Sequence, residues 1–402
     1  MTKSAAWRDG RIFTPERVLL YSLAVIAVYL ALVAGWLATF PRLGLTDSQG
    51  MPLGGDFLGF WSASWIGLHR PYPDLYNNDV LRGVEAQILK TDGSNYFCWL
   101  YPPMAGVLVW PLALLPYGAS FVVWAGTQLA AVLLVLRRIV GHRLVYPAAL
   151  AFAPLALNIF AGQNASISTA LLGGGLLLLP RRPLLAGVLF ASLCYKPHLG
   201  LLIPVALLAA RQWRAMAGGV LGGTLFGGAS LLLAGIDGWA AFLAHGDYAR
   251  TILEQGGVTW GKMASVYASL RSFGLPDGFA WAGQGVMTFG VAALVARIWA
   301  SDCRYALKAA VLAAGVPLAT PFVLTYDLMP VGLAIAWMVA DGFDFGFQPW
   351  DKVVLMALWL APLITLPLGL TTDIGLAPLA VLPLLVLIVR RWRGPRLLMA
   401  AA

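Results

Sequence analysis

The stretch Gly54-Gly55-Asp56-Phe57-Leu58-Gly59-Phe60-Trp61-Ser62-Ala63-Ser64-Trp65 places one carboxylate directly before a short, aromatic-rich segment. Large apolar side chains recur there with the spacing of one helix face, namely Phe57, Phe60, Trp61, Trp65 and Leu68. This spacing predicts an amphipathic helix that lies flat, with its aromatic side chains in the headgroup region of a membrane. The two glycines allow a sharp turn, so Asp56 is expected at the water–lipid boundary.

Two roles for Asp56 follow from this position. Aspartate commonly caps the first turn of a helix, which would make Asp56 a structural residue. A carboxylate held at the membrane surface can instead accept a proton from a hydroxyl group presented there. The two roles are compatible, and the residues outside this stretch decide between them.

The composition is that of a polytopic membrane protein. Hydrophobic residues make up 60% of the 402 residues and charged residues only 11%, where a soluble domain has about a quarter charged. The mean hydropathy is +0.78. The chain is therefore expected to be all-α, with about 12 transmembrane helices in one integral-membrane domain over residues 1–402. The apolar runs lie at about 18–40, 118–136, 144–161, 164–180, 184–195, 198–210, 215–235, 279–299, 306–323, 327–340, 352–370 and 374–390.

Two long polar segments separate these runs. The first outer loop is expected over 41–101 and carries Asp56, and the second is expected over 236–278. The apolar stretch 104–115 is too short to span a bilayer and is expected to dip into it or lie at its surface.

The basic residues indicate the orientation. On this map 19 of the 27 lysines and arginines fall on one side, including Lys3, Arg8, Arg11 and Arg17 of the N-terminal tail, and 12 of the 18 acidic residues fall on the other. Basic residues are enriched in cytoplasmic segments, so both termini are predicted to be cytoplasmic. The net charge of +9 is thereby explained without a nucleic-acid site.

Three further polar clusters project to the same outer side as Asp56. Gly162-Gln163-Asn164 lies between two apolar runs, where exposed helix amides suit a sugar hydroxyl or a phosphate. Tyr326 and Asp327 stand at the outer end of another run and could bind a sugar or steady a neighbouring cation. An ordinary capped turn and a structural helix cap remain open as alternatives for these two clusters.

Lys196-Pro197-His198 marks the tip of a hairpin whose arms are short. Each arm has about 11 residues and reaches about 17 Å, so Lys196 is expected within the outer half of the membrane. A cation at that depth is costly and is a functional candidate, with a lipid-linked phosphate as its partner. The alternative is a lysine that extends its charge to the surface beside a proline kink.

These stretches, in this order, resemble glycosyltransferase family 87 of the GT-C superfamily. The matching features are Asp56-Phe57 with Phe60-Trp61, Leu75-Tyr76, Tyr101-Pro102-Pro103, Leu114-Leu115-Pro116-Tyr117, Gly162-Gln163-Asn164, Lys196-Pro197 and Pro321 with Tyr326-Asp327. The resemblance implies a GT-C architecture, with Asp56 as catalytic base. The residues expected to bind the sugar or the acceptor are Tyr101, Gln163, Asn164, Tyr326 and Asp327. Some mannosyltransferases of the family carry histidines where this sequence has Tyr326 and Asp327.

The leading hypothesis is a glycosyltransferase at the outer face of the inner (plasma) membrane. It uses a polyprenyl-phosphate-linked hexose, expected to be mannose, as donor and a lipid or glycan as acceptor, with inversion at the anomeric carbon. Lys196 and His198 are expected to bind the donor phosphate, and neither a metal nor another cofactor is expected. Membrane lipids are the expected surroundings. A transporter or lipid flippase is the alternative, and a structural membrane scaffold is a third option.

Overall fold

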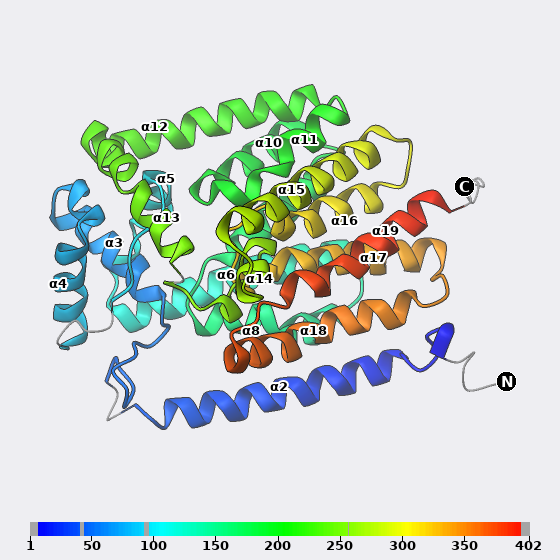
Figure 1. The fold of residues 1–402 in the computed structure, drawn as a ribbon, viewed down its shortest axis with the longest axis horizontal. Coiled ribbons are helices and arrows are strands. Elements are labelled where there is room, and N and C mark those ends of the chain that lie inside the picture. The colour runs from blue at the N-terminus through cyan, green and yellow to red at the C-terminus, as the bar shows by residue number, and fades with distance from the viewer. Residues whose placement is uncertain (1–6, 41–43, 92–95, 256, 395–402) are drawn as a thin grey trace.

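The computed structural model describes residues 7–40, 44–91, 96–255 and 257–394, and its regular structure in these residues is helical (Figure 1). Parts of the expected 41–101 loop (41–43 and 92–95), and Lys3 of the basic tail, lie outside the described residues. The α-helices are α2 (Pro15–Leu37), α3 (Phe57–His69), α4 (Asn78–Leu89), α5 (Pro103–Val109), α6 (Tyr117–Val140), α7 (Val145–Leu150), α8 (Ala153–Phe160), α9 (Ala165–Leu178), α10 (Pro183–Ala191), α11 (Leu202–Ala209), α12 (Trp213–Ala244), α13 (Gly246–Glu254), α14 (Val266–Ser272), α15 (Asp277–Ala300), α16 (Tyr305–Gly315), α17 (Met329–Phe345), α18 (Asp351–Thr372) and α19 (Ala377–Arg393).

The long helices run roughly along one direction, and the two ends of this bundle differ. Helices α3, α4 and α5 gather at one end, whereas the start of α2 and the end of α19 lie at the other (Figure 1). The first and last described residues are therefore at the same end, as expected for termini on one side of a membrane. The element that carries Asp56 is at the opposite end.

Six helical segments in the described part of the chain are long and apolar enough to cross a membrane. They are Pro15–Leu37, Tyr117–Val140, Trp213–Glu254, Asp277–Ala300, Thr325–Phe345 and Asp351–Thr372. Five more apolar segments have only 10–17 residues. The structure thus confirms an all-helical protein with several possible spans, while the number of 12 is not confirmed and stays a prediction.

The first outer loop contains helices, and its aromatic residues differ from the expectation. Phe57 and Phe60 of α3 are buried in the protein, where Phe57 packs on Tyr117 and Phe60 on Trp124. Only Leu68 of the predicted face is exposed. The prediction of headgroup contact is therefore wrong for Phe57 and Phe60, because helix α6 offers them an aromatic partner surface. For the half-buried Trp61 and Trp65 it stays a prediction.

The second outer segment is also more regular than expected. The helix α12 continues past the predicted boundary at 236 and ends at Ala244, after a kink at Gly235, whose φ of +66° lies in the left-handed region. The rest of the segment contains α13, a short 3-10 turn (Trp260–Lys262) and α14. This segment packs back onto the bundle, because the Ala264 amide donates to the Val323 carbonyl at 2.7 Å.

Candidate active site

Two glycines shape the turn that presents Asp56. Gly54 and Gly55 have φ of +78° and +48°, which confirms the sharp turn expected of this pair. Asp56 holds the N-cap position of α3, but its side chain makes no capping hydrogen bond. The Asp56 side chain therefore does not cap helix α3, and its carboxylate is available for other contacts.

Gly162 brings a second loop against this turn. Its φ is +61°, and a side chain at this position would collide with Phe57 and with the Gly54 carbonyl. The Trp124 indole nitrogen donates to the Gly162 carbonyl at 2.8 Å and fixes the loop from α6. The loop at Gly162 thus packs against the turn at Gly54, about 100 positions away in the sequence, because only glycine fits at position 162.

Gln163 makes the closest contact to Asp56. Its Nε2 donates to Asp56 Oδ2 at 2.6 Å, and its Oε1 accepts from the Tyr101 hydroxyl at 3.3 Å. Asp56 is half-buried as a residue, whereas Gln163 is only 6% exposed. The buried Gln163 side-chain amide therefore orients the Asp56 carboxylate.

Asn158, which no sequence pattern marks, replaces Asn164 as the cap of α9. The Asn158 Oδ1 accepts from the amides of Ala165 and Ser166 at 2.7 and 3.4 Å, and the Asn164 side chain makes no capping bond. These helix amides are thus occupied by the protein itself. Asn164 is left free to accept from Lys196 Nζ at 3.3 Å.

Lys196 is buried and paired. It lies between two short 3-10 turns, Ser192–Tyr195 and Pro197–Gly200, as expected for a hairpin tip. Its Nζ donates to Asp327 Oδ1 at 2.5 Å, and the two side chains are only 6% and 1% exposed. Asp327 Oδ2 in turn accepts from the Leu324 amide at 3.3 Å. Asp327 thus pairs with a neighbouring cation, one of the two roles expected of it, and the binding of a donor phosphate by Lys196 stays a prediction.

Tyr326 and His198 flank this ion pair in different ways. The Lys196 Nζ lies 5.6 Å from the centre of the Tyr326 ring, within cation–π range. The His198 ring lies near that of Phe322, with ring centres 6.4 Å apart and the planes tilted by 49°, and its Nε2 is buried with no hydrogen-bond partner. The structure thus joins Tyr101, Gln163, Asn164, Lys196, Tyr326 and Asp327 into one cluster around Asp56, with His198 at its edge.

Lys262 is a cation of this site that no sequence pattern indicates. Its backbone carbonyl accepts from the Thr325 hydroxyl at 2.9 Å, which holds the second outer segment beside the Tyr326–Asp327 turn. The Lys262 side chain is exposed, unlike that of Lys196. Only the packing of two distant segments places it here, so its position in the sequence gives no hint of this role.

Several groups act on the charge of Asp56. Burial raises the pKa of its carboxyl above the ordinary value. The Gln163 hydrogen bond, the positive charges of Lys196 and Lys262, and the Tyr326 hydroxyl all oppose this effect, without cancelling it. A carboxylate with a raised pKa is a better proton acceptor than an ordinary aspartate.

In the described part of the chain, no group of three or more His, Cys, Asp and Glu side chains is arranged to hold a metal ion. The expectation that the site uses no metal or other cofactor stays a prediction.

Comparisons with known proteins point to one family. The family model of glycosyltransferase family 87 matches residues 99–324, more than half of the chain. The matched region contains Tyr101, Gln163, Asn164 and Lys196, and it ends just before Tyr326 and Asp327. No curated protein and no solved structure matches this chain.

Proposed function

This chain belongs to glycosyltransferase family 87, and from that premise we propose that it moves a hexose from a polyprenyl-phosphate donor to a lipid or glycan hydroxyl. Mannose is the sugar we expect. The reaction takes place at the end of the bundle that carries α3, which we assign to the outer face of the inner membrane. A transporter or flippase is not favoured, since the family is one of transferases.

In this proposal Asp56 is the general base. Its carboxylate takes the proton of the acceptor hydroxyl, and the oxygen attacks the anomeric carbon of the donor sugar. The bond between that carbon and the phosphate oxygen breaks, and its electron pair leaves with the polyprenyl phosphate. Because attack and departure occur on opposite faces, the anomeric configuration inverts.

The leaving phosphate gains negative charge and needs a cation nearby. We assign this role first to Lys262, which is exposed and close enough to influence the charge of Asp56. The buried Lys196 supports this role indirectly, because its contacts with Asp327 and Asn164 hold the Gln163–Asn164 turn in place. His198, whose Nε2 is buried without a hydrogen-bond partner, is a second candidate donor to the phosphate. Tyr101, Gln163 and Tyr326 border the space in which the sugar would bind.

One observation carries the proposal. Asp56 sits at a helix start without capping it, and Gln163 Nε2 holds it at 2.6 Å from a loop more than 100 residues away. A purely structural aspartate would bond the first amides of α3. A carboxylate that is oriented by a buried amide and lies within electrostatic reach of two lysines fits a base beside an anionic leaving group.

The test is transfer of label by the purified full-length protein. We expect radiolabelled mannose to pass from polyprenyl-phosphate mannose to a component of a membrane lipid or glycan extract, and not from a nucleotide-linked mannose. The anomeric configuration of the product, read by NMR, should be opposite to that of the donor. Transfer from the nucleotide sugar, or retention of configuration, would overturn the donor or the mechanism.

A further inference from the structure

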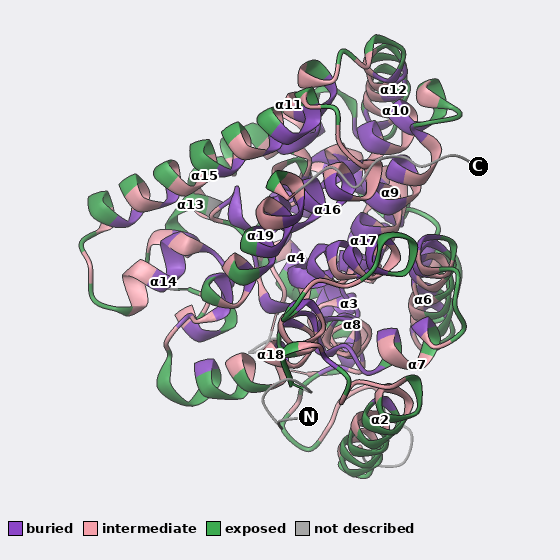
Figure 2. Cartoon of the chain, turned by 90° about the vertical axis from the view of Figure 1, so that its right-hand side faces the viewer, coloured by how far each residue is buried: buried purple, intermediate pink, exposed green. Residues whose placement is uncertain are grey.

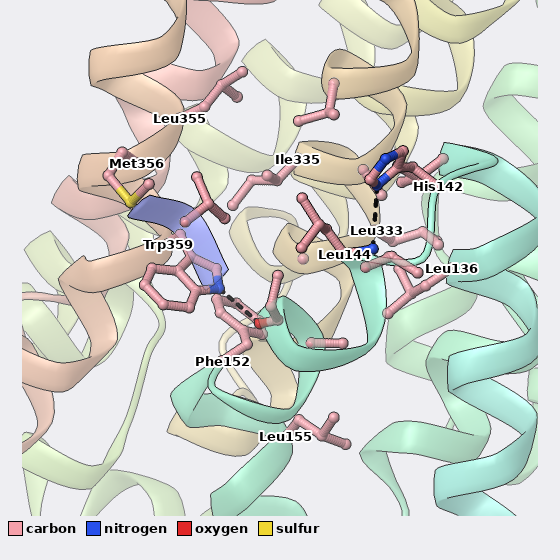
Figure 3. Close-up of a pocket in the computed structure, with 18 of the residues that line it drawn as sticks. Leu136, His142, Leu144, Phe152, Leu155, Leu333, Ile335, Leu355, Met356 and Trp359 are labelled. Carbon is pink, nitrogen blue, oxygen red and sulfur yellow. Dashed lines mark hydrogen bonds between the residues drawn. The ribbon is translucent and has the colours of Figure 1, made fainter. Parts of the chain in front are cut away.

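A large apolar cavity lies between α2, α6, α7, α17 and α18, away from the Asp56 cluster. Its volume is about 390 Å³, in the range of small-molecule sites. Figure 3 shows leucines of α17 and α6, Phe152, and the Trp359 indole of α18 around this space. None of Asp56, Gln163, Lys196, Lys262 or Asp327 lines it.

One wall of the cavity is formed by the start of α2, a helix that stands apart from the bundle. Phe13, Pro15 and Val18 line the cavity from this side. Figures 1 and 2 show α2 set off from the other helices, with most of its surface exposed. Only 6% of its most apolar window is buried in the protein. In a membrane this surface faces lipid, so acyl chains are the molecules that reach the space behind α2.

The end of the cavity nearest the termini is basic. His142 and Lys352 line the cavity itself, and an adjoining hollow is lined by Arg137, His142 and Arg143. Among the described residues, neither Arg137 nor Arg143 makes an ion pair with a carboxylate, and no acidic side chain lines either space. Three permanent positive charges thus line the cavity and the hollow beside it.

We propose that this cavity binds one acyl chain of an anionic phospholipid, with the lipid phosphate held by Arg137, Arg143 and Lys352. The apolar lining excludes water, which leaves an empty apolar space unless a hydrocarbon fills it. The unpaired charges select an anionic headgroup over a zwitterionic one. This site differs from the proposed donor site, because it lies toward the opposite end of the bundle and shares no residue with it.

The test is lipid retention by the full-length protein reconstituted in an equimolar mixture of phosphatidylglycerol and phosphatidylcholine. After extraction into detergent, native mass spectrometry counts the lipids that remain bound. We expect one phosphatidylglycerol per chain in preference to phosphatidylcholine. The double variant Arg137→Gln/Arg143→Gln, at one half-buried and one exposed arginine, should lose this preference, by about fivefold for each charge removed. The matched control Arg181→Gln/Arg182→Gln, whose exposed arginines line neither space, should keep it.

A second variant probes the cavity rather than its rim. Ala336 lines the cavity from α17, and Ala336→Phe should fill it and reduce the number of bound lipids, with an unfolding temperature no lower than that of the wild type. Equal retention of both lipids, or full retention by either variant, would overturn the proposal. Displacement of the bound lipid by polyprenyl phosphate, one for one, would instead show that the cavity takes the donor chain and would also contradict it.

Discussion

At the scale of single residues, substitution of Asp56 distinguishes a catalytic role from a structural one. Asparagine is nearly isosteric with aspartate, and the wild-type side chain makes no capping bond that could be lost. Asp56→Asn should therefore fold normally and bind donor normally. It cannot accept the proton, so transfer should fall by about 10²–10⁴-fold. Single-turnover transfer rates check this, since they expose the chemical step even where product release limits turnover.

The matched comparison is Asp74→Asn, in the same outer region but paired at the surface with Arg70. That variant should keep its transfer rate. An Asp56→Asn protein with full single-turnover activity would place the base elsewhere, with Asp327 as the next carboxylate to test.

Lys262 should tune the pH dependence of transfer. The base must be ionised to act, so kcat/KM should rise with pH as Asp56 loses its proton, and the midpoint should lie above the ordinary aspartate pKa. The positive charge of Lys262 lowers this pKa. Its removal in Lys262→Gln should shift the acidic limb of the kcat/KM profile to higher pH. An acidic limb that keeps its midpoint in this variant would remove Lys262 from the electrostatics of the site.

The buried Lys196–Asp327 ion pair is expected to matter for the stability of the folded protein. Lys196→Ala leaves the nearly fully buried Asp327 carboxylate without its cation, which typically costs about 3–5 kcal/mol. In Lys196→Ala/Asp327→Asn the uncompensated charge is absent, so much of the unfolding temperature should return. Thermal unfolding in detergent measures both. Equal unfolding temperatures for the two variants would show that the pair is not what stabilises this part of the fold.

At the scale of elements, the apolar runs predict most of the long helices. The runs at about 18–40, 118–136, 279–299 and 352–370 correspond to α2, α6, α15 and α18. The turn at Gly54-Gly55 and the short arms around Lys196 were likewise predictable, since glycine pairs and helix length are local properties. Periodicity reports only whether a face is apolar, so it did not show that the aromatic face of α3 packs on α6 rather than on lipid.

The contacts that build the site could not be predicted in the same way. Asp56 meets Gln163, and Lys196 meets Asp327, across 107 and 131 residues of sequence. Nothing in either local pattern specifies the partner. Asn158 likewise caps α9 from within α8, whereas the side chain of Asn164, directly before that helix, makes no capping bond.

The docking of these elements depends on one glycine. Gly162→Ala should destabilise the protein, because its left-handed φ and its contacts with Phe57 and the Gly54 carbonyl leave no room for a methyl group. The variant should also separate Gln163 from Asp56 and slow transfer. Gly118→Ala in α6 is the control, since a side chain there meets no other atom within 4 Å. Unfolding temperature and transfer rate are the measurements, and wild-type values of both for Gly162→Ala would contradict the proposed contact.

At the scale of the whole molecule, the two ends of the bundle hold different chemistry. A buried ion cluster lies at the end of the termini, where Arg391 bridges Asp341 and Asp351, and Arg304 and Arg390 join from the sides. The Trp350 amide also donates to the Arg8 carbonyl at 2.7 Å, so this cluster lies beside the start of the chain. The opposite end carries Asp56 and the Gln163 amide that orients it. Such a division fits a protein whose structural anchoring and catalysis occur on different sides of a membrane.

The last prediction tests which side each end faces. Single cysteines at Ser48, Thr259 and Asp344, all exposed, are introduced after Cys98, Cys194 and Cys303 are replaced by serine or alanine. A membrane-impermeant maleimide added from outside should label Ser48→Cys and Thr259→Cys, which flank the Asp56 cluster in the two outer segments. It should leave Asp344→Cys, beside the ion cluster, unlabelled until the membrane is opened.

The physical reason is the distribution of charge, since 19 of the 27 lysines and arginines are predicted on the side of the termini, and basic residues are enriched in cytoplasmic segments. Labelling of Asp344→Cys alone in intact cells would invert the map and place Asp56 where acceptors of the outer face cannot reach it. Labelling of all three would mean that the two ends are not separated by the membrane. The transfer reaction proposed for the outer face requires the first pattern, because Asp56 must meet its acceptor on the side where the two outer segments are exposed.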